Sequence, residues 1–206
     1  MSDGLRVALT VDVEFPDRPT GPGATVAILD ALEAADVRAT MFIQGRWAEA
    51  EPVVARRIAA DGHLVGNHSH HHARLTMLTG AGVTRDVRAA DAAITAATGV
   101  SPRPWFRCPF GAGAGTLRVV RRLADAGYVD VGWHVDPNDW AGVSAPVLRR
   151  RVADGVRAQG DGAVVLLHGW PDATPIALPG IIADMRASGA TFVTVDELDT
   201  VPGRRL

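Results

Sequence analysis

The sequence predicts a single α/β domain whose parallel strands are joined by crossover helices. Strand-like and helix-like segments alternate along nearly the whole chain, and the connections between successive strands are too long for hairpins. One strand-like segment, 163–167, is entirely apolar, as in a buried strand. A doubly wound sheet and a closed (β/α) barrel both fit these three observations.

Length and composition limit the class of protein. The chain has 206 residues, enough to bury a core, and we treat residues 1–206 as one domain. It is 47% hydrophobic and 21% charged, as in soluble globular proteins, and its net charge of −2 gives no reason to expect nucleic acid or an anionic membrane as partner. The single cysteine, Cys108, excludes an internal disulfide. We find no signal peptide or membrane-length apolar run, so we expect a cytoplasmic location.

Seven segments have the properties of strands. The first alternates and is rich in apolar and β-branched residues, and the others are shorter runs of the same composition. The predicted strands are residues 5–13, 37–43, 64–66, 105–108, 128–135, 163–167 and 191–195.

Helical spacing of apolar residues predicts the segments between these strands. In the first helix, Val26, Leu29 and Leu32 recur on one face. Gly99 follows another helix as a C-terminal stop, and Ser144 is the expected N-cap of a third. The predicted helices are residues 24–35, 47–60, 83–97, 116–126, 145–158 and 181–187.

Four of the seven histidines lie within residues 68–72, directly after a short predicted strand. Imidazole is the commonest metal-ligating side chain. If this segment starts a helical turn, His68 and His72 at i, i+4 share one face and can hold a single ion, whereas His70 and His71 point elsewhere. The alternatives are an exposed histidine-rich loop or a tag remnant, and the internal position argues against a tag.

Other polar residues also stand where predicted strands end. Barrel and open α/β enzymes place their chemistry at the C-terminal ends of strands, so this distribution predicts an enzyme site there. The residues, in chain order, are Asp12, Glu14, His68, His72, Arg107, Asp136, Asp139 and His168.

Asp12 and Glu14 are two residues apart in an extended segment, so both side chains can enter one pocket. One of these carboxylates with His68 and His72 makes a site with open coordination positions, which is typical of catalytic rather than structural metals. The alternative is a solvated strand end with two unrelated charges.

Three further segments carry local signals, and the one at His168 is sharper than the other two. The glycine-rich loop 107–113 can offer backbone amides to an oxyanion, with Arg107 orienting a carboxylate, or it is an ordinary turn. Residues 136–140 are either part of the site or a polar turn with a buried indole. His168 emerges from an apolar strand and needs a polar partner. Its position at a strand end favours a general acid or base over a core histidine.

In chain order, these segments resemble the polysaccharide deacetylase (NodB-like) family of carbohydrate esterases. The resemblance implies a distorted (β/α)7 barrel and a hydrolase that removes an acetyl or other small acyl group from an N-acylated sugar. Five motifs within residues 10–170 carry it: Thr10-Val11-Asp12, Asn67-His68-Ser69-x-x-His72, Arg107-x-Pro109-Phe110-Gly111, Asp136-x-x-Asp139-Trp140 and Leu166-Leu167-His168.

The resemblance implies one divalent ion, most often zinc with cobalt, nickel or manganese as alternatives, bound by His68, His72 and a carboxylate. Asp12 would be the base acting on metal-bound water. The family's first motif usually has two adjacent aspartates, of which the second is a ligand, whereas here Val13 follows Asp12. We expect Glu14 to be the ligand, because i, i+2 side chains share a face. The competing assignment makes Asp12 the ligand.

The remaining matches also receive roles from the resemblance. A backbone amide near Phe110 would stabilise the oxyanion, and His168 would protonate the leaving amine. Arg107 would hold Asp12, and Asp139 would tune His168. Four apolar residues either line a small acyl pocket or belong to the core, namely Trp140, Leu166, Leu167 and Trp170.

Two other functions fit the same residues. A cytoplasmic deacylase of a small, non-polymeric amide is favoured by the missing signal peptide. A non-catalytic sugar-binding relative is the other alternative, and the presence together of Asp12, Arg107, Asp139 and His168 argues against it.

Overall fold

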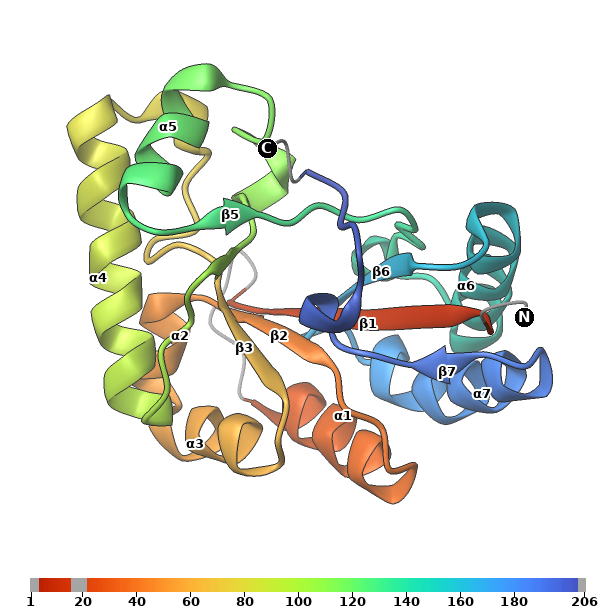
Figure 1. The fold of residues 1–206 in the computed structure, drawn as a ribbon. Helices are drawn as coiled ribbons and strands as arrows, with labels where there is room; N and C mark the ends of the chain where they lie inside the picture. Colours follow the sequence, from red (N-terminus) through yellow and green to blue (C-terminus); the bar gives the residue numbers. More distant parts are fainter. Residues whose placement is uncertain (1–3, 16–21, 204–206) are drawn as a thin grey trace.

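Seven parallel strands form the centre of the protein in the computed structural model, which describes residues 4–15 and 22–203 (Figure 1). The strands are β1 (Arg6–Val13), β2 (Thr40–Ile43), β3 (Leu64–Asn67), β4 (Trp105–Phe106), β5 (Val129–Asp130), β6 (Ala163–His168) and β7 (Thr191–Phe192). Helices follow most of the strands, as the alternation predicts. That all 206 residues form one domain stays a prediction, since residues 1–3, 16–21 and 204–206 lie outside the described part.

The sheet follows the order β5-β4-β3-β2-β1-β6 and then meets the chain that leaves β5. At this junction Val135 forms a parallel bridge with Val165, and Leu166 N–H donates to the carbonyl of Val135 over 2.9 Å. β6 pairs with one edge of β1. On the other edge, β2 pairs with Thr10–Val13 and β7 pairs with Arg6–Val7. The predicted distorted barrel is therefore confirmed, and its closure rests on an irregular segment.

Side chains along β1 alternate between the helix layer and the barrel interior. Val7, Leu9, Val11 and Val13 belong to the large outer core, whereas Ala8 packs in a smaller cluster inside the barrel. Thr10, Asp12 and Glu14 share the parity of Ala8, and all three are buried. β1 and the residue that directly follows it therefore supply apolar packing on one face and two carboxylates on the other.

In the described part of the chain, seven helices surround the strands. In Figure 1, α1, α6 and α7 pack together on one side of the barrel, and α2 to α5 pack together on the other. They are α1 (Gly23–Ala34), α2 (Gly45–Ala50), α3 (Pro52–Ala60), α4 (Gly80–Thr98), α5 (Leu117–Asp125), α6 (Ala145–Gln159) and α7 (Ala173–Ala187).

Two helix predictions are wrong in extent. The segment 47–60 is two helices, because Pro52 has no N–H to donate and starts α3 after the break at Glu51. The prediction 181–187 omits the first half of α7, where Pro179 and Gly180 weaken the local helical signal although the helix passes through them. Gly99 ends α4 in the left-handed conformation with φ of 80°, as predicted.

Two further predictions need correction. Ser144 occupies the N-cap of α6, but its side chain forms no capping hydrogen bond. The predicted strand 128–135 pairs regularly only over β5, because the chain then bends toward Val135.

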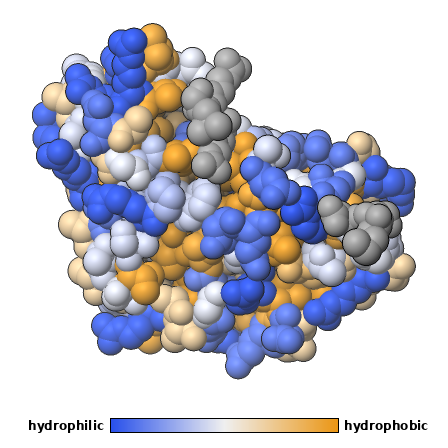
Figure 2. Space-filling view, in the orientation of Figure 1, coloured by the Kyte–Doolittle hydropathy of each residue, from blue (hydrophilic) through white to orange (hydrophobic). Residues whose placement is uncertain are grey.

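On the face shown in Figure 2, hydrophobic side chains gather in the centre between hydrophilic borders. No helix within residues 4–15 and 22–203 is long and apolar enough to cross a membrane.

We predict that Gly155→Ala destabilises the protein by about 1–3 kcal/mol, because the new Cβ would collide with the side chain of Val135 at the barrel closure. In an open helix position the same change is stabilising. Gly180→Ala in α7 is the control, since its Cβ meets the flexible, exposed side chain of Arg149. Urea unfolding of both variants measures the difference, and equal stability of the two would contradict the close packing.

Candidate active site

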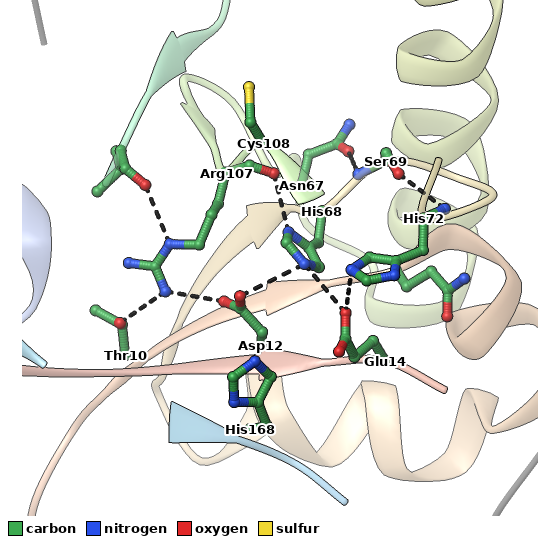
Figure 3. Close-up of polar contacts among 12 residues, drawn as sticks. Thr10, Asp12, Glu14, Asn67, His68, Ser69, His72, Arg107, Cys108 and His168 are labelled. Atoms are coloured by element: carbon green, nitrogen blue, oxygen red, sulfur yellow. Dashed lines mark hydrogen bonds and ion pairs between the residues drawn. The ribbon is translucent and has the colours of Figure 1, made fainter. Parts of the chain in front are cut away.

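Arg107 lies inside the barrel with 0% of its surface exposed and uses its guanidinium to hold Asp12 (Figure 3). Its Nη1 donates to Asp12 Oδ1 and to Thr10 Oγ1, both over 2.8 Å. Its Nε donates to the carbonyl of Val131 and its Nη2 to that of Gly132, each over 3.0 Å. A buried charge needs such a set of acceptors to offset its lost hydration. Asp12 is therefore fixed at the end of β1, as the expected contact with Arg107 requires.

Glu14, His68 and His72 converge beside this pair. One ligand atom from each can be chosen so that the three atoms lie within 4.8 Å of one another. Glu14 Oε2 is 2.5 Å from His72 Nε2 and 3.2 Å from His68 Nε2. Asp12 Oδ2 is 3.4 Å from His68 Nε2, but Asp12 does not belong to the cluster of three. The geometry thus favours Glu14 over Asp12 as the metal carboxylate.

The histidines converge through a loop, so the expected helical turn at 68–72 is wrong. Ser69 and His72 both have left-handed backbone conformations, with φ of 64° and 55°. Asn67 Oδ1 accepts the N–H of Ser69 over 2.8 Å, and Ser69 Oγ accepts the N–H of His72 over 3.0 Å. These side-chain hydrogen bonds replace helical ones and turn the two imidazoles toward each other.

His70 and His71 point away from the site, as predicted. Their backbone N–H groups donate to the carboxylate of Asp86 in α4 over 2.9 and 3.2 Å, and His71 Nδ1 lies 2.7 Å from it. Asp86 therefore ties the histidine loop to α4. Asp136, another predicted site residue, is exposed, and among the described residues it accepts only the N–H of Asn138 in its own turn.

The Glu14, His68 and His72 cluster fits a divalent cation. His68 Nδ1 is 2.9 Å from the carbonyl of Arg107, so it carries the proton and Nε2 presents a lone pair toward Glu14. Glu14 Oε2 is buried and accepts no hydrogen bond of good geometry, whereas Oε1 accepts from Trp170 Nε1 over 3.3 Å. Three electron-pair donors thus face a common point, and a positive charge there would satisfy them.

The same arrangement attracts protons when no cation is present. Burial by itself raises the pKa of Glu14, but the close contacts with the His68 and His72 imidazoles outweigh it and hold this pKa well below its usual value. Burial lowers the pKa of His68, but the charges of Asp12 and Glu14 raise it overall. Protons and a divalent cation therefore compete for this cluster.

His168 ends β6 next to Asp12, with which it is in register. Its Nδ1 lies 2.7 Å from Asp139 Oδ1, and its backbone N–H donates to Asp139 Oδ2 over 2.8 Å. Thr174 Oγ1 donates to the same Oδ2 over 2.8 Å. Asp139 is thus locked to one side of the imidazole, and Nε2 is left for chemistry.

Charge keeps His168 protonated despite its burial. Burial lowers the pKa of His168, but the hydrogen bond and charge of Asp139, with the charges of Asp12 and Glu14, raise it to about 9. The imidazole therefore carries its proton at neutral pH, as a general acid must before it acts.

Phe110 lies next to His72 and carries the backbone amide that was expected to bind an oxyanion. Its φ is 56°, its side chain is 55% exposed, and its ring lies 4.5 Å from that of His72. The Arg74 guanidinium lies over the Phe110 ring, 4.4 Å from the ring centre. Within the described residues, the N–H of Phe110 donates no hydrogen bond. An N–H without a partner in a residue that contacts His72 can donate to an oxyanion.

The four apolar candidates have different environments. Trp140 is 50% exposed beside Asp139, and Trp170 contacts Glu14 through its indole N–H. Leu166 is 3% exposed and has the inward parity of His168, so a role in an acyl pocket stays a prediction. Leu167 lies in the outer core, so the pocket role considered for it is wrong.

Several residues of the site were not predicted. Phe42 and Trp133 lie 4.1 and 5.7 Å from the Arg107 guanidinium, and Thr174 fixes Asp139. The aromatic residues have no sequence signal that would link them to Arg107. Thr10 stands in the first motif, and its inward parity with Asp12 could have identified it.

The family model described as polysaccharide deacetylase matches residues 3–131 of the chain. The chitooligosaccharide deacetylase of Rhizobium leguminosarum bv. trifolii is 34% identical over 197 residues, covering 96% of this chain and 84% of that protein. The peptidoglycan-N-acetylglucosamine deacetylase PgdA of Listeria monocytogenes is 32% identical over 194 residues, covering 94% of this chain. This chain spans 38% of the length of that Listeria relative.

A solved structure adds a relative of different description. A wild-type Bacillus anthracis protein, described as a pseudoenzyme of carbohydrate esterase family 4, superposes with a TM-score of 0.84 at 30% identity. The match covers 94% of this chain and 64% of that one. A mutant of that protein, described as having restored enzymatic activity, superposes with the same TM-score of 0.84.

We predict that Asp139→Asn lowers the pKa of His168 from about 9, because the hydrogen bond and charge of Asp139 then no longer oppose the effect of burial. Since the folded pKa lies above the unfolded one, the pair stabilises the metal-free protein fully below pH 6.5 and loses this effect as pH rises through 9. Histidine NMR titration and thermal unfolding of chelator-treated protein measure both effects. Asp172→Asn, at an exposed carboxylate nearby, is the control, and an unchanged His168 titration in Asp139→Asn would refute the assignment.

Proposed function

The chain belongs to the polysaccharide deacetylase family, and we propose that it is a divalent-metal-dependent hydrolase that removes acetyl groups from N-acetylated sugars in an oligomer or polymer. The observation that carries this proposal is the complete set of groups that amide hydrolysis needs. Glu14, His68 and His72, which would hold a cation, lie at the end of the barrel where the buried Asp12 and the imidazole of His168 also lie. The backbone amide of Phe110, next to His72, would be the fourth group. The deacetylases of Rhizobium and Listeria support the sugar amide as substrate.

The two carboxylates have different roles: Glu14 is a metal ligand and Asp12 is the general base. A divalent cation on Glu14, His68 and His72 would supply a Lewis acid that polarises the acyl carbonyl and makes water a better nucleophile. Asp12 takes the proton from the attacking water, since Arg107 fixes its Oδ1 and its Oδ2 faces His68. The roles follow from position, because each carboxylate is held by a different neighbour.

The imidazole of His168 completes the hydrolysis. It gives a proton to the departing sugar nitrogen, so the amide C–N bond breaks with a neutral amine as leaving group. Asp139 holds Nδ1 and stabilises the imidazolium until that transfer. The N–H of Phe110 donates to the oxyanion that develops when water attacks the acyl carbon. Exposed Phe110 and Trp140 offer aromatic surfaces that suit sugar rings beside the reacting one.

Two alternatives keep specific support. A small, non-polymeric amide would use the same groups, and turnover of acylated amines without turnover of chitooligosaccharides would favour it. A non-catalytic role has support from the Bacillus anthracis relative and from Val13 in the first motif. Metal binding without release of acetate from any acylated sugar or amine would favour that second alternative.

We predict that Asp12→Asn and His168→Ala each lower kcat for a chitooligosaccharide by about 10²–10⁴-fold, because each removes one proton-transfer group. Both variants should retain the metal, since neither removes Glu14, His68 or His72. Acetate release and metal content by mass spectrometry measure the two effects. Metal loss in Asp12→Asn would overturn the base assignment, and full activity in His168→Ala would exclude the acid role.

We predict that Glu14→Gln weakens divalent-metal affinity by at least about 10-fold, because a neutral amide replaces the anionic ligand. His72→Ala should have the same effect, whereas the control His71→Ala should bind metal as the wild type does, since His71 lies 60% exposed outside the cluster. Calorimetric titration of chelator-treated protein with zinc gives the affinities. Wild-type affinity in Glu14→Gln would show that the carboxylate ligand is another residue.

A further inference from the structure

We propose that the C-terminal segment 195–203, called here the C-terminal strap, positions Arg107 and through it Asp12 for catalysis. The inference rests on the proposed deacetylase function for its kinetic consequence. It assigns a catalytic support role to a segment that carries none of the motifs identified in the sequence.

The strap holds the peptide group on which Arg107 depends. Pro202 offers its carbonyl to the N–H of Gly132 over 2.6 Å. The carbonyl of Gly132 accepts from Arg107 Nη2, and that of Val131 accepts from Arg107 Nε, each over 3.0 Å. The strap thus holds the Val131–Gly132 peptide group through its N–H, while the carbonyl of the same peptide group, that of Val131, accepts from Arg107 Nε.

Residues 131–133 need this support because they lie beyond the short strand β5. Val131 N–H still donates to the carbonyl of Phe106 over 2.7 Å, but the next backbone hydrogen bond to a strand is that of His134 to Val164 over 2.9 Å. Between these two points, the strap supplies the partner of Gly132. Figure 1 shows the dark blue chain passing from β7 to this segment.

Apolar contacts anchor the strap inside the barrel. Val195, Leu198 and Val201 are buried in the inner cluster with Val131, the residue that supplies one Arg107 acceptor. The N–H of Val195 donates to Thr40 Oγ1 over 3.1 Å. The strap is therefore continuous with the wall that surrounds the guanidinium, where Phe42 of the same cluster lies 4.1 Å from it.

At Gly203, the last described residue of the strap, the backbone lies close to residues 130–132. Gly203 has φ of 91°, and a Cβ there would lie 3.0 Å from the carbonyl oxygen of Asp130 and 3.0 Å from the nitrogen of Gly132. Backbone atoms cannot move aside as a flexible side chain can. A substitution at this position must therefore displace the strap from residues 130–132.

The test compares Gly203→Ala with Gly189→Ala. Gly189 also has a positive φ, of 80°, but a Cβ there meets nothing within 4 Å, so this control applies similar backbone strain without the collision. We expect Gly203→Ala to lower kcat for a chitooligosaccharide by about 10-fold or more with KM changed less than about 2-fold, since small displacements of catalytic groups reduce rates strongly. Gly189→Ala should keep wild-type kcat, and zinc affinity should be unchanged in both.

A second readout reports on Arg107 directly. In wild-type protein, the Nε–H of Arg107 is buried and hydrogen-bonded, so its NMR resonance should exchange slowly with solvent. Gly203→Ala, and separately the milder Val201→Ala, should accelerate that exchange. If the wild type proves inactive, the proposed function fails while this measurement still tests the strap.

Two results would overturn the inference. Wild-type kcat and slow Arg107 exchange in Gly203→Ala would show that the strap has no influence on the guanidinium. Loss of kcat together with weakened zinc affinity and a lower melting temperature than in Gly189→Ala would indicate general destabilisation instead of positioning.

Discussion

A buried guanidinium at the centre of the barrel is the constraint on which the rest of the site depends. Arg107 has 0% exposure, and an isolated charge in that environment would cost several kcal/mol. The protein offsets this cost with one carboxylate, one hydroxyl and two carbonyl acceptors. Asp12 is therefore paired with Arg107, and the other carboxylate, Glu14, contacts the imidazoles of His68 and His72.

The alternation of β1 explains why the two carboxylates stand two residues apart. Asp12 and Glu14 share the interior face, while Val13 between them packs in the outer core against the helices. A carboxylate at position 13 of this regular strand would enter that apolar layer, where it would lose hydration without a partner. The spacing Asp-x-Glu thus lets one strand serve both the Arg107 pair and the metal cluster.

The repeated strand-helix pattern predicted a parallel α/β fold, whereas the choice of a barrel over a doubly wound sheet came from the family resemblance. The position of polar residues at strand ends predicted that Asp12, His68 and Arg107 lie close together, as they do. The pairing of His68 and His72 was predicted for the wrong reason, because the helical turn is replaced by left-handed residues and side-chain hydrogen bonds that local periodicity does not encode. The barrel closure at Val135 and the strap under Gly132 were not predictable, since both are long-range backbone contacts of irregular segments. Stacking partners such as Trp133 likewise depend on tertiary packing.

Asp12 and Glu14 have different roles in this site, and the position of the bound cation distinguishes these roles directly. A crystal of the zinc-loaded protein, measured at the zinc absorption edge, would locate the cation by its anomalous signal. We predict a single peak bonded to Glu14 Oε2 and to the Nε2 atoms of His68 and His72, with Asp12 still paired to Arg107. A peak bonded to the Asp12 carboxylate, with Glu14 turned away, would contradict it.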